Sequence, residues 1–204
     1  RYEQVLYNPR DDKLLYTIAG SRTPFDWLVN NPAIGLGLFK YTPRYNEAKN
    51  VLAKAKAYVD AKYVETGDNL TIFGKWYGLN GQPWCAMFVS KCFDEAGAIK
   101  LVAAQSKKGF ASCNIGWQWF VKNKRTVAVG QAQPGDIVFF NFDDNPHTTE
   151  HVGIVVSNDG KNLITYEGNT SPEKATNASQ ANGGGVYKRK RPYSLVMGVA
   201  RPQW

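Results

Sequence analysis

In Gln82-Pro83-Trp84-Cys85-Ala86-Met87-Phe88-Val89, a cysteine lies where a helix is expected to begin. Pro83 suits the first helical position, because its missing N–H costs nothing there. Apolar residues recur at helical spacing as far as Ala96, and Gly97 can end a helix of about four turns. Unpaired N–H groups and the helix dipole favour a thiolate in the first turn. The stretch therefore predicts a nucleophilic Cys85, and a small buried core cysteine is the alternative.

A cysteine nucleophile needs a base, and the chain contains two histidines. His151 begins an apolar, β-branched run over 151–157, which predicts a strand. His147 lies in a polar, turn-rich loop over 141–150. Because a base must be held rigidly within reach of the thiol, we predict that His151 is the base and that His147 is a solvated loop residue.

A third group is expected to orient the imidazole. A second strand is predicted over 163–169, and the Asp-Gly pair at 159–160 is typical of a hairpin turn between the two strands. This hairpin would bring Glu167 or Asn169 beside His151. The two residues are two apart and share one face of a strand. Taken alone, Glu167 would by default be a surface acid and Asn169 a turn residue.

Four segments of the chain resemble the CHAP family, the cysteine, histidine-dependent amidohydrolases/peptidases. The segments are Pro-Trp-Cys-Ala-Met-Phe-Val-Ser at 83–90, Gln-Pro-Gly-Asp-Ile-Val-Phe-Phe at 133–140, His-Val-Gly-Ile-Val at 151–155 and Tyr-Glu-Gly-Asn-Thr-Ser at 166–171. The resemblance covers about residues 66–202. It implies an α+β, papain-like cysteine hydrolase fold, with the nucleophile helix packed on an antiparallel β-sheet. It also implies that Cys85 is the nucleophile, His151 the base, and Glu167 and Asn169 the orienting groups.

The resemblance implies an activity as well. CHAP enzymes occur in phage endolysins and in bacterial wall-remodelling enzymes, whereas the related NlpC-type endopeptidases usually carry Asp-Cys-Ser-Gly at the nucleophile. The expected function is a peptidoglycan hydrolase, either an N-acetylmuramoyl-L-alanine amidase or a peptide endopeptidase, that acts through a thioester. Two alternatives remain open: a papain-like protease or toxin with a non-wall substrate, and a non-catalytic wall-binding module. Cleavage of purified peptidoglycan would distinguish the expected hydrolase from a protease or toxin with another substrate. The paired thiol and imidazole argue against a non-catalytic module.

Other residues near Cys85 are candidates for the oxyanion hole and for substrate binding. The Cys85 N–H would supply one oxyanion donor, and either Asn80 or Gln82 the other. Aromatic rings flank the nucleophile and are candidates for lining a groove, with core packing an equal alternative. These rings are Trp76, Tyr77 and Trp84.

No metal and no cofactor are expected. Some phage CHAP domains bind calcium through an acidic loop before the nucleophile, but Leu70 to Gln82 contains no carboxylate and one lysine. Calcium requires six to eight oxygen ligands, usually with several carboxylates. Asp143, Asp144 and Glu150 offer a weaker alternative and are better explained as a solvated loop.

The charge of the chain indicates its partners. The 204 residues carry a formal net charge of +8, which favours acidic polymers such as the anionic polymers of a bacterial wall. The densest basic run, 188–191, predicts a strand or hairpin edge, and no nucleic-acid-binding motif accompanies it. No apolar run approaches the ~18 residues of a membrane span. We therefore expect peptidoglycan and anionic wall polymers as partners, no nucleic acid, no membrane, and a monomer.

Three cysteines do not form a closed disulfide framework. Cys92 lies two turns after Cys85 and is predicted to be a core residue. Cys113 precedes a helix predicted over 116–121. We expect reduced thiols, consistent with synthesis in a bacterial host cytoplasm or carriage on a phage particle and with action at the cell wall. A secreted bacterial enzyme is the alternative.

The first part of the chain differs from the rest. Residues 1–44 are interrupted by Pro and Gly and are predicted to be an N-terminal arm or linker. The remainder, 45–204, is predicted to be the CHAP-like catalytic domain. A helix predicted at about 43–64 would pack on it, with Thr42 as its cap and Pro43 in its first turn.

Overall fold

The computed structural model describes residues 5–8, 13–16, 43–143, 148–173 and 180–204. The chain divides into two units, Arg1–Asn46 and Glu47–Trp204. In the first, strands β1 (Val5–Asn8) and β2 (Lys13–Tyr16) pair antiparallel, which the sequence analysis did not predict. The rest of the predicted arm lies outside the described residues, and its boundary at residue 44 stays a prediction.

The second unit is built around a six-stranded antiparallel sheet with the strand order β3-β8-β4-β5-β6-β7. The hairpin predicted between β5 and β6 is confirmed, with the side chain of Asp159 accepting hydrogen bonds from the backbone of Lys161 and Asn162 in the turn. The strands are β3 (Thr126–Val127), β4 (Ile137–Phe140), β5 (His151–Asn158), β6 (Asn162–Thr170), β7 (Gly185–Pro192) and β8 (Val196–Ala200).

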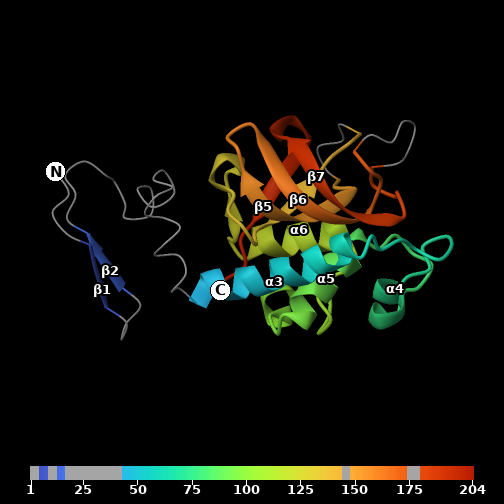
Figure 1. Cartoon of the computed structure of the whole chain (residues 1–204), viewed down its shortest axis with the longest axis horizontal. Coiled ribbons are helices and arrows are strands. Elements are labelled where there is room, and N and C mark those ends of the chain that lie inside the picture. The colour runs from blue at the N-terminus through green and yellow to red at the C-terminus, as the bar shows by residue number, and fades with distance from the viewer. Residues whose placement is uncertain (1–4, 9–12, 17–42, 144–147, 174–179) are drawn as a thin grey trace. The chain divides into compact units, whose positions relative to one another are not determined.

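Helices cover one face of this sheet (Figure 1). They are α3 (Pro43–Asp60), α4 (Ile72–Tyr77), α5 (Cys85–Glu95) and α6 (Cys113–Lys122), with short 3-10 turns η2 (Ile99–Val102), η3 (Val129–Gln131) and η4 (Tyr193–Leu195). Helix α5 packs on β5 and β6. The fold is therefore α+β, with the cysteine-bearing helix on an antiparallel sheet, as the sequence predicted. No helix in the described part of the chain is long and apolar enough to cross a membrane.

Helix boundaries differ from the predictions in three places. Helix α3 ends at Asp60 rather than near residue 64, and α6 begins at Cys113 rather than at residue 116. Helix α5 begins at Cys85, so the predicted placement of Pro83 inside the helix is wrong. The backbone of Trp84, the N-cap residue, is not helical (φ −122°, ψ 12°), so Pro83 lies before the helix. The Trp84 ring is fully buried and stacks on Phe73 with centroids 5.1 Å apart. The helix is 11 residues long, about three turns rather than four.

Two glycines let the layers approach closely enough to form the site. A Cβ on Gly168 in β6 would lie 2.6 Å from Cβ of Phe88 on α5, so this glycine lets the helix lie against the sheet. A Cβ on Gly153 in β5 would lie 2.7 Å from Cγ of Glu167, so this glycine makes room for the carboxylate side chain. Both glycines belong to the segments that carry the family resemblance.

The core has two parts. The larger cluster lies between the helices and the sheet and includes Phe88, Phe139 and Ile154. The smaller cluster includes Val138, Phe140 and Leu163. Successive strand residues point to opposite faces, so this second cluster occupies the other face of the sheet.

Candidate active site

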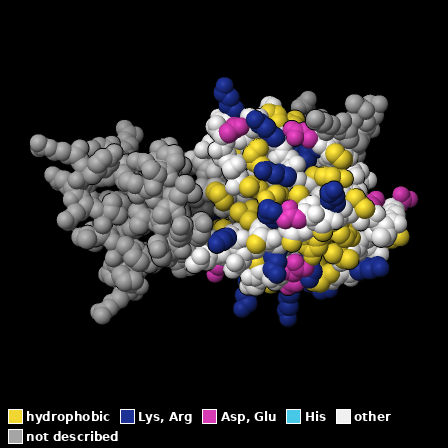
Figure 2. Space-filling view, in the orientation of Figure 1, with side chains coloured by type: hydrophobic (Ala, Val, Ile, Leu, Met, Phe, Trp, Pro, Cys, Tyr) yellow, Lys and Arg dark blue, Asp and Glu magenta, His cyan; other side chains and the backbone are white. Residues whose placement is uncertain are grey.

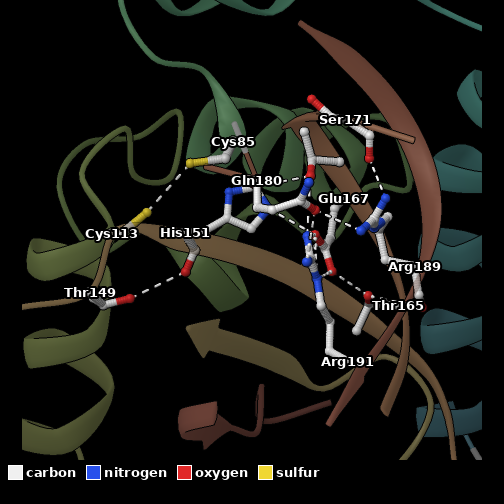
Figure 3. A network of polar contacts seen from close by, with 11 residues as sticks. Cys85, Cys113, Thr149, His151, Thr165, Glu167, Ser171, Gln180, Arg189 and Arg191 are labelled. Atoms are coloured by element: carbon white, nitrogen blue, oxygen red, sulfur yellow. Dashed lines mark hydrogen bonds and ion pairs between the residues drawn. The ribbon is translucent and has the colours of Figure 1, made fainter. Parts of the chain in front are cut away.

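Two cysteine side chains meet at the helix starts. Cys85 is the first residue of α5, and Cys113 is the first residue of α6. Their sulfur atoms are 3.5 Å apart, and both residues are buried (Figure 3). The Ser112 side chain caps α6 by accepting a hydrogen bond from the N–H of Ile115. The ends of two helices thus direct their N-terminal dipoles toward this pair of thiols.

His151, the first residue of β5, is fully buried beside the thiols. Its Nε2 donates a hydrogen bond of 2.9 Å to Oε2 of Glu167. Its other ring nitrogen, Nδ1, has no hydrogen-bond partner among the described residues and lies on the side of the ring that faces Cys85 (Figure 3). The imidazole therefore has one nitrogen anchored and the other free for proton transfer with the thiol.

Glu167 on β6 is held from several directions. Arg191 on β7 contacts both carboxylate oxygens, with Nη2 2.6 Å from Oε2 and Nε 3.0 Å from Oε1. The hydroxyl of Thr165 donates to Oε1 at 2.5 Å. Glu167 and Arg191 are both buried, so water has little access to this ion pair. The ion pair fixes the position of the carboxylate.

The side chains of Arg191 and Arg189 are held in place by further hydrogen bonds. Arg191 also donates to the side-chain oxygens of Gln180 and Thr170, at 3.1 Å and 3.2 Å. Arg189 donates to Gln180 and to the backbone oxygen of Ser171. The network therefore ties the end of β6 to β7, behind the histidine (Figure 3).

The pKa shifts follow from these contacts. Burial disfavours the charged imidazole, but the neighbouring Cys85 thiol and the hydrogen bond to Glu167 outweigh it and raise the pKa of His151 to about 9. Burial also disfavours the carboxylate, but His151 and Arg191 lower the pKa of Glu167 to about 2. The Cys113 thiol, followed by His151 and the Ala86 N–H, holds the pKa of Cys85 well below its ordinary value against the effect of burial. These shifts favour a thiolate on Cys85, a proton on His151 and an ionised Glu167.

Asn169 does not join this chain of contacts. It is fully buried with φ 58°, and neither Oδ1 nor Nδ2 has a hydrogen-bond partner in the described part of the chain. Its backbone oxygen accepts from Gly183. The pairing of β6 with β7 shifts register between Glu167 and Thr170, so the two orienting candidates do not follow one regular strand. A role for Asn169 in orienting His151 stays a prediction.

The candidates before the nucleophile have different surroundings. Asn80 is exposed, and its Oδ1 accepts from the N–H of Thr71 at 2.9 Å, which closes the loop around α4. Gln82 is exposed. Trp84 has no exposed surface and donates from Nε1 to Glu65, so it is a core residue and cannot line a groove in this structure. The oxyanion roles of Asn80 and Gln82 stay predictions.

Trp76 and Tyr77 remain candidates for substrate contact. Both are half-buried at the end of α4, with their rings edge to face. The ammonium groups of Lys91 and Lys108 lie 4.9 Å and 5.8 Å from the Trp76 ring. Tyr77 hydrogen-bonds through its hydroxyl to Ser106 at 3.2 Å. Lysines over an indole make a cation–π arrangement, so this corner presents both aromatic and basic character.

The residues of the weaker candidate calcium site and the second histidine lie partly outside the described residues. His147 and Asp144 are not among the described residues. Glu150 uses its carboxylate within the loop, accepting from the N–H of Phe142 and from Thr148. Across the described ranges, no three His, Cys, Asp or Glu residues gather as a metal site. Independence from calcium stays a prediction.

The basic run 188–191 alternates along the edge strand β7. Lys188 and Lys190 are exposed, and Lys190 lies 3.4 Å from Asp159. Arg189 and Arg191 are buried, so they cannot form part of an attracting surface. The run is a strand edge, as predicted, but its two arginines support the site instead of the surface.

Comparison with known proteins bears on the family resemblance. Residues 76–169, a little under half of the chain, match the family model of the CHAP domain. Members of this family are typically cysteine-dependent hydrolases, of the peptidoglycan hydrolase or amidase/peptidase kind. The matched range contains Cys85, Cys113, His151, Glu167 and Asn169. Arg191 lies outside it.

The structure is also similar to a solved lipoprotein-like protein of the NLP/P60 family from Staphylococcus aureus. The sequence identity is 17% and the TM-score 0.42, with 90% of this chain and 56% of that chain covered. The chain thus spans little more than half the length of that protein. No curated protein matched the chain.

Two residues of the site were not predicted as such from the sequence. Cys113 was noted only as a thiol before a helix, and Arg191 only as part of a basic run. The signal for Arg191 was available, because a period of two in a strand alternates faces, and the sheet buries every second basic residue of the run. No comparable local signal brings Cys113 to Cys85.

Proposed function

We propose that this chain hydrolyses an amide bond of bacterial peptidoglycan through a covalent thioester on Cys85. The observation that carries the proposal is the buried contact between His151 Nε2 and Glu167, which leaves Nδ1 of the ring free beside the Cys85 thiol. A thiol with an anchored imidazole beside it is the arrangement that nucleophilic catalysis requires. The CHAP match supports peptidoglycan as the class of substrate.

The chemistry follows from the protonation states. The Cys85 thiolate attacks the carbonyl carbon of a wall amide, and the oxyanion forms beside the N-terminus of α5, where backbone N–H groups are available. The His151 imidazolium gives its proton to the leaving amine, and the C–N bond breaks to leave a thioester. The neutral imidazole then takes a proton from water, which attacks the thioester and releases Cys85. Glu167 keeps the ring oriented and stabilises its charge in both steps.

Removing the nucleophile tests the proposal. Cys85→Ala should abolish release of soluble fragments from purified peptidoglycan, while Cys92→Ala, a change in the core of the same helix, should leave release measurable. Circular dichroism and thermal melting of both variants check the fold. Full digestion by Cys85→Ala would contradict the assignment, and an inert wild-type protein on purified peptidoglycan would favour a different substrate.

The bond cut is read from the same digest. Mass spectrometry that finds intact stem peptides freed from muramic acid would identify an amidase. New amines within the stem or cross-bridge would identify an endopeptidase. Either product fits the thioester mechanism.

A further inference from the structure

The site contains a second thiol, and the proposed reaction does not use it. Cys113 and Cys85 lie 28 residues apart in the chain, yet their sulfur atoms are 3.5 Å apart. A disulfide bond is about 2.05 Å long, so the sulfurs need to approach by about 1.5 Å. Figure 3 shows the two side chains directed toward each other from α5 and α6. Each side chain belongs to the first residue of its helix.

The two thiols differ in pKa. Cys85 is beside the His151 imidazolium and carries the low pKa of a thiolate. The hydrogen bond to the Cys85 sulfur, followed by burial and the negative charge of Cys85, raises the pKa of Cys113 well above its ordinary value, so Cys113 is the protonated partner. A thiolate is the form that reacts with peroxide, and the sulfenic acid that results condenses with a neighbouring thiol as that thiol gives up its proton. The third thiol, Cys92, is buried in the core with its pKa raised by burial.

We propose that Cys85 and Cys113 form a reversible disulfide when the protein meets a hydroperoxide, and that this modification stops hydrolysis while protecting the nucleophile. The loss of hydrolysis rests on the proposed function, whereas the disulfide itself does not. In this role Cys113 is the resolving thiol, and Cys85 remains the group that touches substrate.

The chemistry balances with one hydroperoxide per chain. The Cys85 thiolate attacks one peroxide oxygen, the O–O bond breaks, and the departing oxygen takes a proton, leaving a sulfenic acid on Cys85. The Cys113 sulfur then attacks the sulfenic sulfur, the S–O bond breaks, and the Cys113 proton leaves with the hydroxide as water. Two thiols lose two electrons and become a disulfide, while hydrogen peroxide gains two electrons and becomes two waters. A dithiol reductant reverses the modification by exchange.

Without a resolving thiol the outcome differs. A sulfenic acid on Cys85 that meets more peroxide proceeds to sulfinic acid, which a dithiol cannot reduce. The structure therefore makes two distinct expectations. The wild-type protein recovers after oxidation and reduction, and a variant that lacks the Cys113 thiol does not.

The test treats the wild-type chain with one to a few equivalents of hydrogen peroxide and follows the thiols directly. Two of the three cysteines should lose reactivity to a thiol reagent. The intact mass should fall by two hydrogens, and a non-reducing peptide map should contain a linked pair of peptides from the starts of α5 and α6. Dithiothreitol should restore the mass, the thiols and the release of peptidoglycan fragments.

Two variants complete the experiment. Cys92→Ala should still form the linked peptides. Cys113→Ser should acquire two oxygens on Cys85 and recover less than a tenth of its own starting activity after reduction. If Cys113→Ser does not fold, the wild-type peptide map decides alone. Sulfinic acid on Cys85 with a free Cys113, or links only between chains, would overturn the proposal. A correct linkage in a protein inert on peptidoglycan would instead count against the proposed function.

Discussion

His151 determines how the candidate site responds to pH. Its ring is buried between a thiol and a carboxylate, and the neighbouring Cys85 and the hydrogen bond to Glu167 outweigh burial to raise its pKa from 6.5 to about 9. In the proposed mechanism the active form has a thiolate on Cys85 and a proton on His151. We therefore expect activity to fall when either group changes its protonation state.

We expect a bell-shaped profile of kcat/KM against pH, measured on a soluble wall fragment. The alkaline limb should lie near pH 9, where His151 loses its proton, and the acid limb should lie well below the ordinary pKa of a thiol, where Cys85 gains one. Stability should follow the same group: because folding raises the His151 pKa, its contribution is fully present below about pH 6.5 and lost as the pH rises through about 9. An alkaline limb near pH 6.5 would contradict the buried ion pair.

Substitutions of Glu167 and Arg191 should move the alkaline limb of the pH profile in opposite directions. Glu167→Gln removes a negative charge and should shift the alkaline limb to lower pH, with kcat lower by roughly 10²-fold or more. It also leaves Arg191 as a buried unpaired charge, at a cost of about 3–5 kcal/mol in the free energy of unfolding. Arg191→Gln removes a positive charge and should shift the limb to higher pH.

Arg125→Gln is the matched control for these two variants. Arg125 contacts Gln203 and the Trp119 ring and makes none of the contacts to Glu167 described above. The pH profile of this variant should coincide with that of the wild type. Shifts of the same sign in Glu167→Gln and Arg191→Gln would mean that the pair does not act on His151 through charge.

Helix α5 and strand β6 must approach closely to bring the thiol to the sheet. The approach depends on Gly168, where an added Cβ would meet Cβ and Cγ of Phe88 at 2.6 Å and the Trp84 ring at 2.8 Å. Because the neighbouring groups are fully buried, they have little room to move away. The position of Cys85 relative to His151 is thus set by a glycine that takes no part in the chemistry.

Gly168→Ala should destabilise the fold by about 1–3 kcal/mol, measured by urea unfolding, and should lower activity per folded molecule because α5 is displaced. Gly130→Ala offers a control, since its added Cβ would meet nothing within 4 Å and should change stability by no more than about 0.5 kcal/mol. Equal stability of the two variants would show that the layers can separate freely at β6.

Basic side chains do not gather in one place on the face that Figure 2 shows. Figure 2 shows Lys and Arg side chains scattered over the visible face, among hydrophobic and acidic ones. Of the basic run on β7, only Lys188 and Lys190 are exposed. We therefore expect the net charge of +8 to act on anionic wall polymers as a distributed field instead of as one patch.

Lysis of intact cells should fall steeply as salt is added, because attraction between exposed charges is screened over about 8 Å at physiological ionic strength. Cleavage of a small soluble wall fragment should change much less. Neutralising Lys188 and Lys190 together should reduce lysis as much as neutralising the exposed pair Lys122 and Lys124, if the field is distributed. A loss confined to the β7 pair would place the attraction at that edge, and equal salt sensitivity on both substrates would place it in the site itself.

Much of the candidate site could be predicted from local sequence. A cysteine before an amphipathic run, a histidine at the start of a β-branched run and a glutamate on the next strand of an Asp-Gly hairpin all depend on the backbone preferences of near neighbours. The structure places Cys85, His151 and Glu167 together as these patterns predicted, although the roles assigned to them await experiment. Helix ends were less accurate: Trp84 has a non-helical backbone, so α5 begins at Cys85 and Pro83 lies outside it.

The contacts that complete the site come from packing. Arg191 reaches Glu167 across 24 residues because the register of β6 and β7 buries that face of the strand, and Cys113 reaches Cys85 because α5 and α6 begin side by side. Residue types alone do not determine such pairs, since a basic run and a cysteine before a helix each fit many environments. Their partners are decided by strand register and helix placement, which depend on how the entire core packs.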